Sequence, residues 1–142
     1  MDAFIPDDGQ SVMDLFPIAT AAHFRKVARN QGGGWRLPGG EGHLHLWGLK
    51  PGKARDFVRA RFCDFSLRCF EEPISLPVDR KRYIPAIFIE SAAADYPARP
   101  IFSPFAEKAR RLGWGVTQLE TGHDYHVERP EEIARILLSC TA

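Results

Sequence analysis

The sequence lacks any long apolar run and any marked excess of charge of one sign. A membrane-spanning helix needs about 20 consecutive apolar residues, and no segment of the 142 residues approaches that length. The 19 lysines and arginines nearly balance the 18 aspartates and glutamates, so the net charge is +1. Nucleic acids and anionic membranes favour strongly basic partners, and we therefore expect neither as a partner.

Cysteine is scarce, and its spacing argues against two common site types. Cys63, Cys69 and Cys140 are odd in number and form no Cys-x-x-Cys pair, which predicts neither a disulfide framework nor a thiolate zinc site. His43 and His45 could join later histidines in a zinc site, but they lie in a glycine-rich segment predicted to be a loop. We expect no metal ion and no cofactor. The acidic N-terminus is unlike a secretory signal, so we expect a cytoplasmic protein.

Residues 1–78 show helical patterns but no series of strands. Residues 2–6 have the composition of a strand exit, and an alanine-rich helical stripe follows over residues 18–30. Many glycines and prolines predict a loop over residues 35–51, and a short helix is predicted over residues 54–62. We therefore expect this part to be a helical, loop-rich cap.

Residues 79–142 have the alternating order of an α/β domain. The short, continuous apolar run over residues 84–90 is typical of a strand buried on both faces of a parallel sheet. A helix over residues 102–112, a strand over residues 114–119 and a helix that begins at Pro130 follow. This order predicts an α/β sandwich with two parallel strands and covering helices.

Acidic and histidine side chains follow both predicted strands. Glu90 and Asp95 come after the first strand, and His123, Asp124 and His126 come after the second. Functional groups of an open α/β sheet gather at the carboxyl ends of its strands, so we expect both loops at one edge. A carboxylate beside an imidazole fixes its tautomer and stabilises the imidazolium during proton transfer. The pattern therefore predicts an acid–base pair.

Two segments resemble a known family. Thr121-Gly122-His123-Asp124, followed by Arg-Pro-Glu-Glu-Ile-Ala at residues 129–134, resembles the ending of the α/β-hydrolase superfamily. The nearest branch contains plant methylesterases, hydroxynitrile lyases and pyrethroid-hydrolase-like bacterial proteins. The opening residues 1–11 resemble the segment that leads from the sheet into the cap in that branch. The chain is thus similar to the cap and C-terminal portion of such a hydrolase.

The resemblance implies a Ser, Asp and His triad in that chain order. His123 would be the general base and Asp95 the acid, with Glu90 as the alternative acid. A small apolar ester would be the substrate, although the same triad supports lyase chemistry in this branch. Three aromatic residues would line the substrate pocket or, alternatively, pack the cap onto the sheet: Trp35, Trp47 and Phe57.

The nucleophile of that family is missing from the sequence. Its Gly-x-Ser-x-Gly elbow occurs nowhere in the 142 residues, so the sequence predicts a triad remnant that is inactive on esters by itself. The alternative is a non-catalytic fragment that associates with itself or with a missing N-terminal half. Two parallel strands leave strand edges and apolar surface that favour such a partner.

Overall fold

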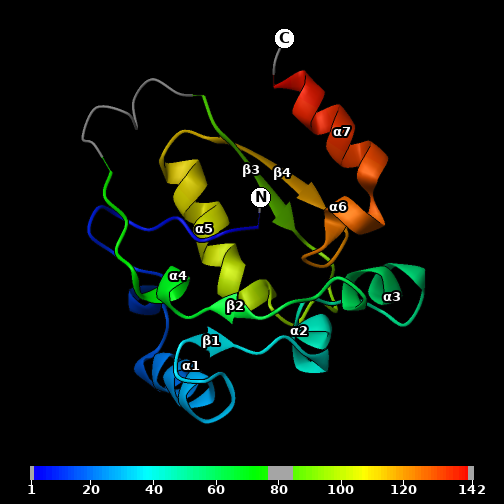
Figure 1. Cartoon of the computed structure of the whole chain (residues 1–142). Coiled ribbons are helices and arrows are strands. Elements are labelled where there is room, and N and C mark those ends of the chain that lie inside the picture. Colours follow the sequence, from blue (N-terminus) through cyan, green and yellow to red (C-terminus); the bar gives the residue numbers. More distant parts are fainter. Residues whose placement is uncertain (1, 77–84, 141–142) are drawn as a thin grey trace. The chain divides into compact units, whose positions relative to one another are not determined.

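The computed structural model describes residues 2–76 and 85–140 (Figure 1). By their contacts, these residues form two compact units. The first unit comprises residues 2–5, Glu41–Arg61 and 85–140, and the second comprises Pro6–Gly40 and residues 62–76. The predicted domain boundary between residues 78 and 79 lies outside the described residues. Glu41–Arg61, which is part of the predicted cap, belongs by its contacts to the unit that contains the parallel strands.

The first unit is built on two parallel strands, β3 (Ile87–Ser91) and β4 (Gly115–Leu119). Their register runs from Ile87 beside Gly115 to Ser91 beside Leu119. The mixed α/β architecture and the two parallel strands confirm the coarse fold prediction. Because the strands are parallel, the loops that follow them leave from the same edge of the sheet.

Both faces of this sheet are covered by helices. Phe88 packs with alanines of α5 (Arg99–Arg111). Ile89, the next residue, packs with Tyr125 of α6 (Tyr125–Glu128) and Ile133 of α7 (Pro130–Ser139). Successive strand residues point to opposite faces. A strand buried on both faces therefore has a continuous apolar run in place of an alternating pattern.

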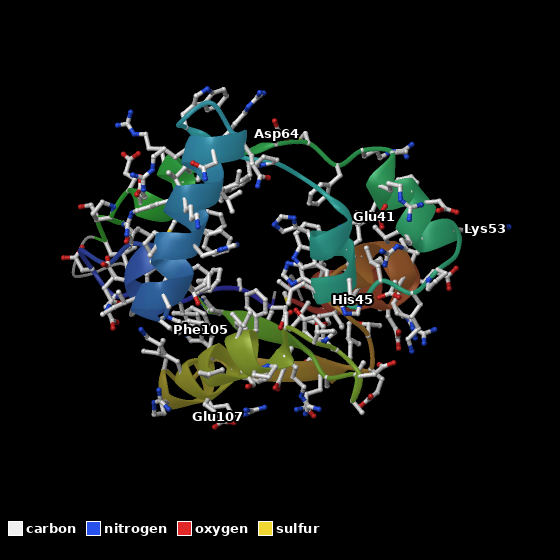
Figure 2. All side chains as sticks on the ribbon, turned by 90° about the horizontal axis from the view of Figure 1, so that it is seen from below. Glu41, His45, Lys53, Asp64, Phe105 and Glu107 are labelled. Carbon is white, nitrogen blue, oxygen red and sulfur yellow. The ribbon has the colours of Figure 1, made fainter. Side chains whose placement is uncertain are left out.

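The helix ends follow the expected local signals. Gly113 has a φ of +77° just beyond α5, where the left-handed conformation favours glycine. Pro130 opens α7, with Glu131 and Glu132 in its first turn. Phe105 and Glu107 lie on opposite sides of α5, one towards the sheet and one towards solvent (Figure 2). None of the described helices is both long and apolar enough to cross a membrane.

Residues Glu41–Arg61 form α2 (Glu41–Leu46) and α3 (Lys53–Arg59). Helix α3 confirms the predicted short helix, whereas α2 shows that the loop prediction over residues 35–51 was wrong for its central part. The glycine content of that segment disfavours a helix, but tertiary contacts override this preference. Leu44 is buried, and Arg55 Nη2 lies 2.7 Å from Glu41 Oε2.

The first described residues are held between β3 and α5. The backbone N–H of Asp2 donates a hydrogen bond to the Ile89 carbonyl at 2.6 Å. The ring of Phe4 lies 5.2 Å from Phe102 and 5.4 Å from Phe105, measured between centroids. These contacts fix the Asp2 side chain at the carboxyl end of β3.

In the second unit, most of the regular secondary structure is helical. Its elements are the 3-10 turn Met13–Leu15, α1 (Ile18–Gln31), β1 (Arg36–Leu37), β2 (Phe65–Ser66) and α4 (Arg68–Glu71), with β1 and β2 antiparallel. Its core contains Met13, Ala21, Ala28, Leu37 and Leu67. Gly32 follows α1 directly, and a Cβ at this position would lie 1.7 Å from the Arg36 carbonyl oxygen, so only glycine fits there.

Candidate active site

His123 and Asp2 form a side-chain pair at the carboxyl edge of the sheet. His123 lies in the loop after β4, and its Nδ1 is 3.0 Å from Asp2 Oδ2. The His123 side chain is 28% exposed, whereas Asp2 is 1% exposed. A buried carboxylate on Nδ1 leaves Nε2 as the nitrogen that can exchange a proton. The arrangement is therefore suited to general-base chemistry.

Tyr96 completes the hydrogen bonding of Asp2. Its hydroxyl donates to Asp2 Oδ2 at 2.8 Å and lies 3.4 Å from His123 Nδ1. Burial and the neighbouring Asp2 carboxylate raise the pKa of Tyr96 far above its ordinary value, so the phenol stays protonated. Asp2 Oδ1 accepts a further bond from the Ser91 backbone N–H at 3.4 Å. The carboxylate is thus held from two sides.

Aromatic rings and backbone hold the His123 imidazole in place. The Phe102 ring stacks on it with centroids 5.1 Å apart, and the Trp47 ring lies at 5.5 Å. The His123 backbone N–H donates to the Trp47 carbonyl at 2.8 Å. A Cβ on Gly122 would lie 2.3 Å from that same carbonyl oxygen. This close approach therefore requires a glycine before the histidine.

Ser91 ties the histidine loop to the end of β3. Its hydroxyl donates to the Gly122 carbonyl at 2.8 Å, and the residue is 1% exposed. Glu128 lies on the other side of this loop, and burial raises the pKa of its carboxyl group, an effect opposed by a hydrogen bond from the Gly122 backbone. Residues 121–124 are thus held by both β3 and α6.

The two predicted acids lie in other pairs. Asp95 Oδ2 is 2.8 Å from Lys50 Nζ, and the Asp95 side chain is 64% exposed. Glu90 accepts hydrogen bonds from Gln118 at 2.9 Å and from Arg110 at 3.1 Å. The structure therefore gives each of them a partner other than His123, and it brings Asp2 to the imidazole.

The remaining histidines and acids of the motif have separate environments. His126 is 58% exposed, and its Nε2 lies 3.8 Å from Asp124 Oδ1. Burial raises the pKa of Asp124, while His123 and His126 oppose this shift. His43 and His45 lie on helix α2, where residues two apart point in different directions. Among residues 2–76 and 85–140, no cluster of three or more His, Cys, Asp or Glu side chains could hold a metal ion.

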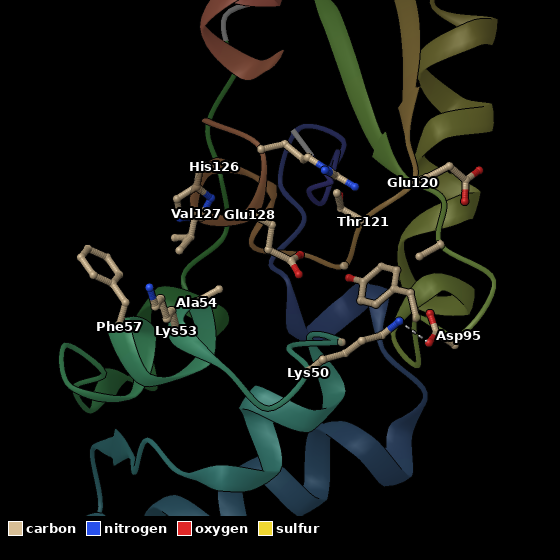
Figure 3. A pocket seen from close by; sticks show the side chains of 15 residues that line it. Lys50, Lys53, Ala54, Phe57, Asp95, Glu120, Thr121, His126, Val127 and Glu128 are labelled. Atoms are coloured by element: carbon tan, nitrogen blue, oxygen red, sulfur yellow. Dashed lines mark ion pairs between the residues drawn. The ribbon is translucent and has the colours of Figure 1, made fainter. Parts of the chain in front are cut away.

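An open pocket of about 990 Å³ lies beside the histidine loop (Figure 3). Tyr96 and Gly122 line it on one side, and Phe57 of α3 lines it on another. Lys50 and Asp95 lie at its rim, joined by their ion pair (Figure 3). Of the three predicted substrate-binding aromatics, Phe57 thus lines this pocket, Trp47 contacts His123, and Trp35 lies in the second unit, 61% exposed.

The pairing of Asp2 was not foreseen from the sequence. A signal for it was present, because residues 2–6 have the composition of a strand exit and functional groups gather at such exits. The strand to which Asp2 is attached by hydrogen bonding lies nearly ninety positions along the chain, however, at Ile89. Only the folded structure shows that contact.

The sequence is similar to a carbendazim hydrolyzing esterase from Nocardioides sp. (strain SG-4G). The two are 28% identical over 148 residues, which cover 96% of this chain and 57% of the esterase. The chain therefore spans little more than half the length of this relative. No family model matches the chain, and no solved structure matches it. The similarity supports a relationship to esterases and no finer assignment.

Proposed function

We propose that this chain carries the acid–base part of a carboxylic-ester hydrolase of the α/β-hydrolase type. His123 is the general base, and Asp2, in place of the predicted Asp95, is the carboxylate that orients it. The observation that carries the proposal is the 3.0 Å contact between His123 Nδ1 and the buried Asp2 Oδ2. Similarity to an esterase over 96% of the chain supports the reaction class.

In the proposed reaction, a serine hydroxyl attacks the ester carbonyl and transfers its proton to His123 Nε2. Asp2 stabilises the resulting imidazolium through Nδ1–H. The tetrahedral oxyanion collapses to an acyl-enzyme, and the leaving alcohol takes the proton from His123. Water then attacks the acyl group, again with His123 as base, which releases the acid and restores the serine.

In this proposal the serine is supplied from outside the 142 residues, in which no Gly-x-Ser-x-Gly occurs. Ser91 lies close to the pair, but it is 1% exposed and its hydroxyl donates to the Gly122 carbonyl. It is therefore a loop anchor and not a nucleophile. We expect the chain by itself to show no serine-dependent ester hydrolysis.

The surroundings of the pair support a small, largely apolar ester as substrate. Trp47 and Phe102 enclose the imidazole, and Phe57 lines the neighbouring pocket. Aromatic side chains supply apolar contact area with defined geometry. Because the esterase that the chain resembles is named for its hydrolysis of carbendazim, carbendazim is the first substrate to test beside simple p-nitrophenyl esters.

A chimera tests this proposal. The region of the Nocardioides esterase that matches this chain is replaced by the 142 residues, and hydrolysis of p-nitrophenyl acetate and carbendazim is measured. We expect activity that is abolished in His123→Ala, and no activity from the 142-residue chain by itself. A folded chimera whose hydrolysis does not depend on His123 would contradict the assignment of the base, and serine-dependent turnover by the isolated chain would contradict the external nucleophile.

A second candidate function is that of a subunit that acts by association. Two leucines near the end of α7 are well exposed, Leu137 at 49% and Leu138 at 70%. Among the described residues, β4 pairs with β3 on one side only. Apolar surface and strand edges of this kind favour a partner. Light scattering coupled to size-exclusion chromatography tests self-association: a dimer that Leu138→Glu dissociates would support it, and a monomer across the concentration range would exclude it.

A further inference from the structure

We propose that Tyr96 is a positioning residue that sets the proton affinity of His123 through Asp2. The inference rests on the proposed function for its catalytic meaning, because it concerns the strength of the same base. The hydrogen-bond geometry on which it is built is independent of any reaction. Its test is accordingly a titration of the imidazole and not an activity assay.

The geometry places two donors on one carboxylate oxygen. Tyr96 Oη lies 2.8 Å from Asp2 Oδ2, and His123 Nδ1 lies 3.0 Å from the same atom. Both Tyr96 and Asp2 are at least 97% buried, since their exposed fractions are 3% and 1%. Hydrogen bonds to a buried charged acceptor are stronger than those between neutral groups. The phenol and the imidazole therefore compete for the negative charge of Asp2.

This competition predicts the direction in which each substitution changes the basicity of His123. A carboxylate that already accepts a bond from a phenol stabilises an imidazolium less than a carboxylate without that bond. Removing the Tyr96 hydroxyl should therefore make His123 a stronger base, and removing the Asp2 charge should make it a weaker one.

The other groups that face His123 do not contact its Nδ1 atom with a charged side chain. Phe102 and Trp47 cover its ring and carry no charge. Asp124, on the same loop, interacts with His123 by charge, and no hydrogen bond joins the two side chains in the described part of the chain. The charged group in contact with His123 Nδ1 is thus Asp2, and the side chain that modulates Asp2 is Tyr96.

Tyr125 provides a matched control. It is also 3% exposed, and the charge of Asp2 likewise contributes to raising its pKa. Among the described residues, however, the tyrosine that hydrogen-bonds Asp2 is Tyr96. Tyr125→Phe therefore removes a buried hydroxyl near the same carboxylate without removing the proposed interaction.

The test is an NMR titration of the full chain with ¹³C-labelled histidine, in which His123 is assigned by its loss in His123→Asn. We expect its titration midpoint to rise by about 0.5–1 pH unit in Tyr96→Phe, the equivalent of one ordinary hydrogen bond. It should fall in Asp2→Asn and change little in Tyr125→Phe. Incorporation of 3-fluorotyrosine at position 96, a stronger donor, should lower the midpoint and provides a second substitution if Tyr96→Phe does not fold.

Three results would overturn the inference. These are an unchanged midpoint in folded Tyr96→Phe, a shift in the opposite direction, and a shift of equal size in Tyr125→Phe. Failure of the ester-hydrolysis test leaves these readouts unaffected, because the titration needs no substrate and no serine. The two proposals can therefore fail separately.

Discussion

Asp2 and His123 are 121 positions apart in the chain, yet their side chains meet at 3.0 Å with the carboxylate buried beneath the imidazole. The contact depends on two attachments. The Asp2 backbone bonds to β3 at Ile89, and the His123 backbone bonds to the Trp47 carbonyl. Both hydrogen bonds join residues that are far apart in the sequence, so the Asp2–His123 pair forms only when the first unit is folded.

The Asp2–His123 contact predicts a large kinetic effect in the active chimera. Asp2→Asn should lower kcat/KM for p-nitrophenyl acetate by roughly 10²–10⁴-fold, because the amide cannot stabilise the imidazolium or hold its tautomer. Asp95→Asn is the control, and it should change the rate less than about threefold, since Asp95 is an exposed partner of Lys50. The reverse order of these effects would restore Asp95 as the acid.

The close approach at Gly122 predicts a loss of stability. Gly122→Ala places a Cβ about 2 Å from the Trp47 carbonyl, so the loop must move, and we expect a destabilisation of about 2–3 kcal/mol. Gly42→Ala is the matched substitution inside α2, where nothing lies within 4 Å of the added Cβ. It should stabilise the chain by about 0.5–1 kcal/mol. Urea denaturation measures both, and equal effects would refute the packing argument.

Asp124 predicts a pH-dependent difference in stability. Burial raises its pKa above the ordinary 3.8, so the folded state favours the protonated form. Its contribution to stability is present below about pH 4 and is lost as pH rises through the raised pKa. Asp124→Asn keeps this side chain neutral throughout. Its free energy of unfolding relative to the parent protein should therefore increase from pH 4 to pH 7 in urea titrations.

Asp14 is the control for this measurement, because its pKa is shifted in the opposite direction from that of Asp124. Hydrogen bonds from the Ser11 hydroxyl and backbone, at 2.7 and 2.8 Å, lower its pKa. Its contribution to stability is present above about pH 4 and is lost as pH falls through the lowered pKa. Asp14→Asn should therefore lose stability relative to the parent as pH rises to 7. Parallel slopes for Asp14→Asn and Asp124→Asn would show that burial does not govern Asp124.

The packing of α7 predicts a contrast between two of its aliphatic residues. Ile133 is 6% exposed and packs with Ile89 and Leu119, so Ile133→Ala should cost about 2–4 kcal/mol through lost burial and a residual cavity. Leu138 is 70% exposed, and Leu138→Ala should change the free energy of unfolding by less than about 0.5 kcal/mol in a monomer. A larger, concentration-dependent loss in Leu138→Ala would instead reveal an interface.

Much of the first unit could be predicted from local sequence patterns. The apolar run before residue 91 predicts a strand covered on both faces, and the observed β3 has α5 on one face and α7 on the other. Pro130 and Gly113 mark helix ends where the structure has them. Helix α2 could not be predicted in this way, because its stability comes from the burial of Leu44 and from ion pairs with α3.

The candidate site also has one part that local sequence predicts and one part that it does not. The position of the proposed base follows from the chain order: the motif Gly122-His123 comes directly after a predicted strand, and a strand–helix–strand order places the ends of both strands at one edge of a parallel sheet. The carboxylate proposed to orient that base could be assigned only from tertiary contacts. Glu90, Asp95 and Asp2 all stand at that edge, and Arg110 and Lys50 pair with the first two. Which carboxylate reaches the imidazole depends on contacts between segments far apart in the chain, and no local pattern encodes them.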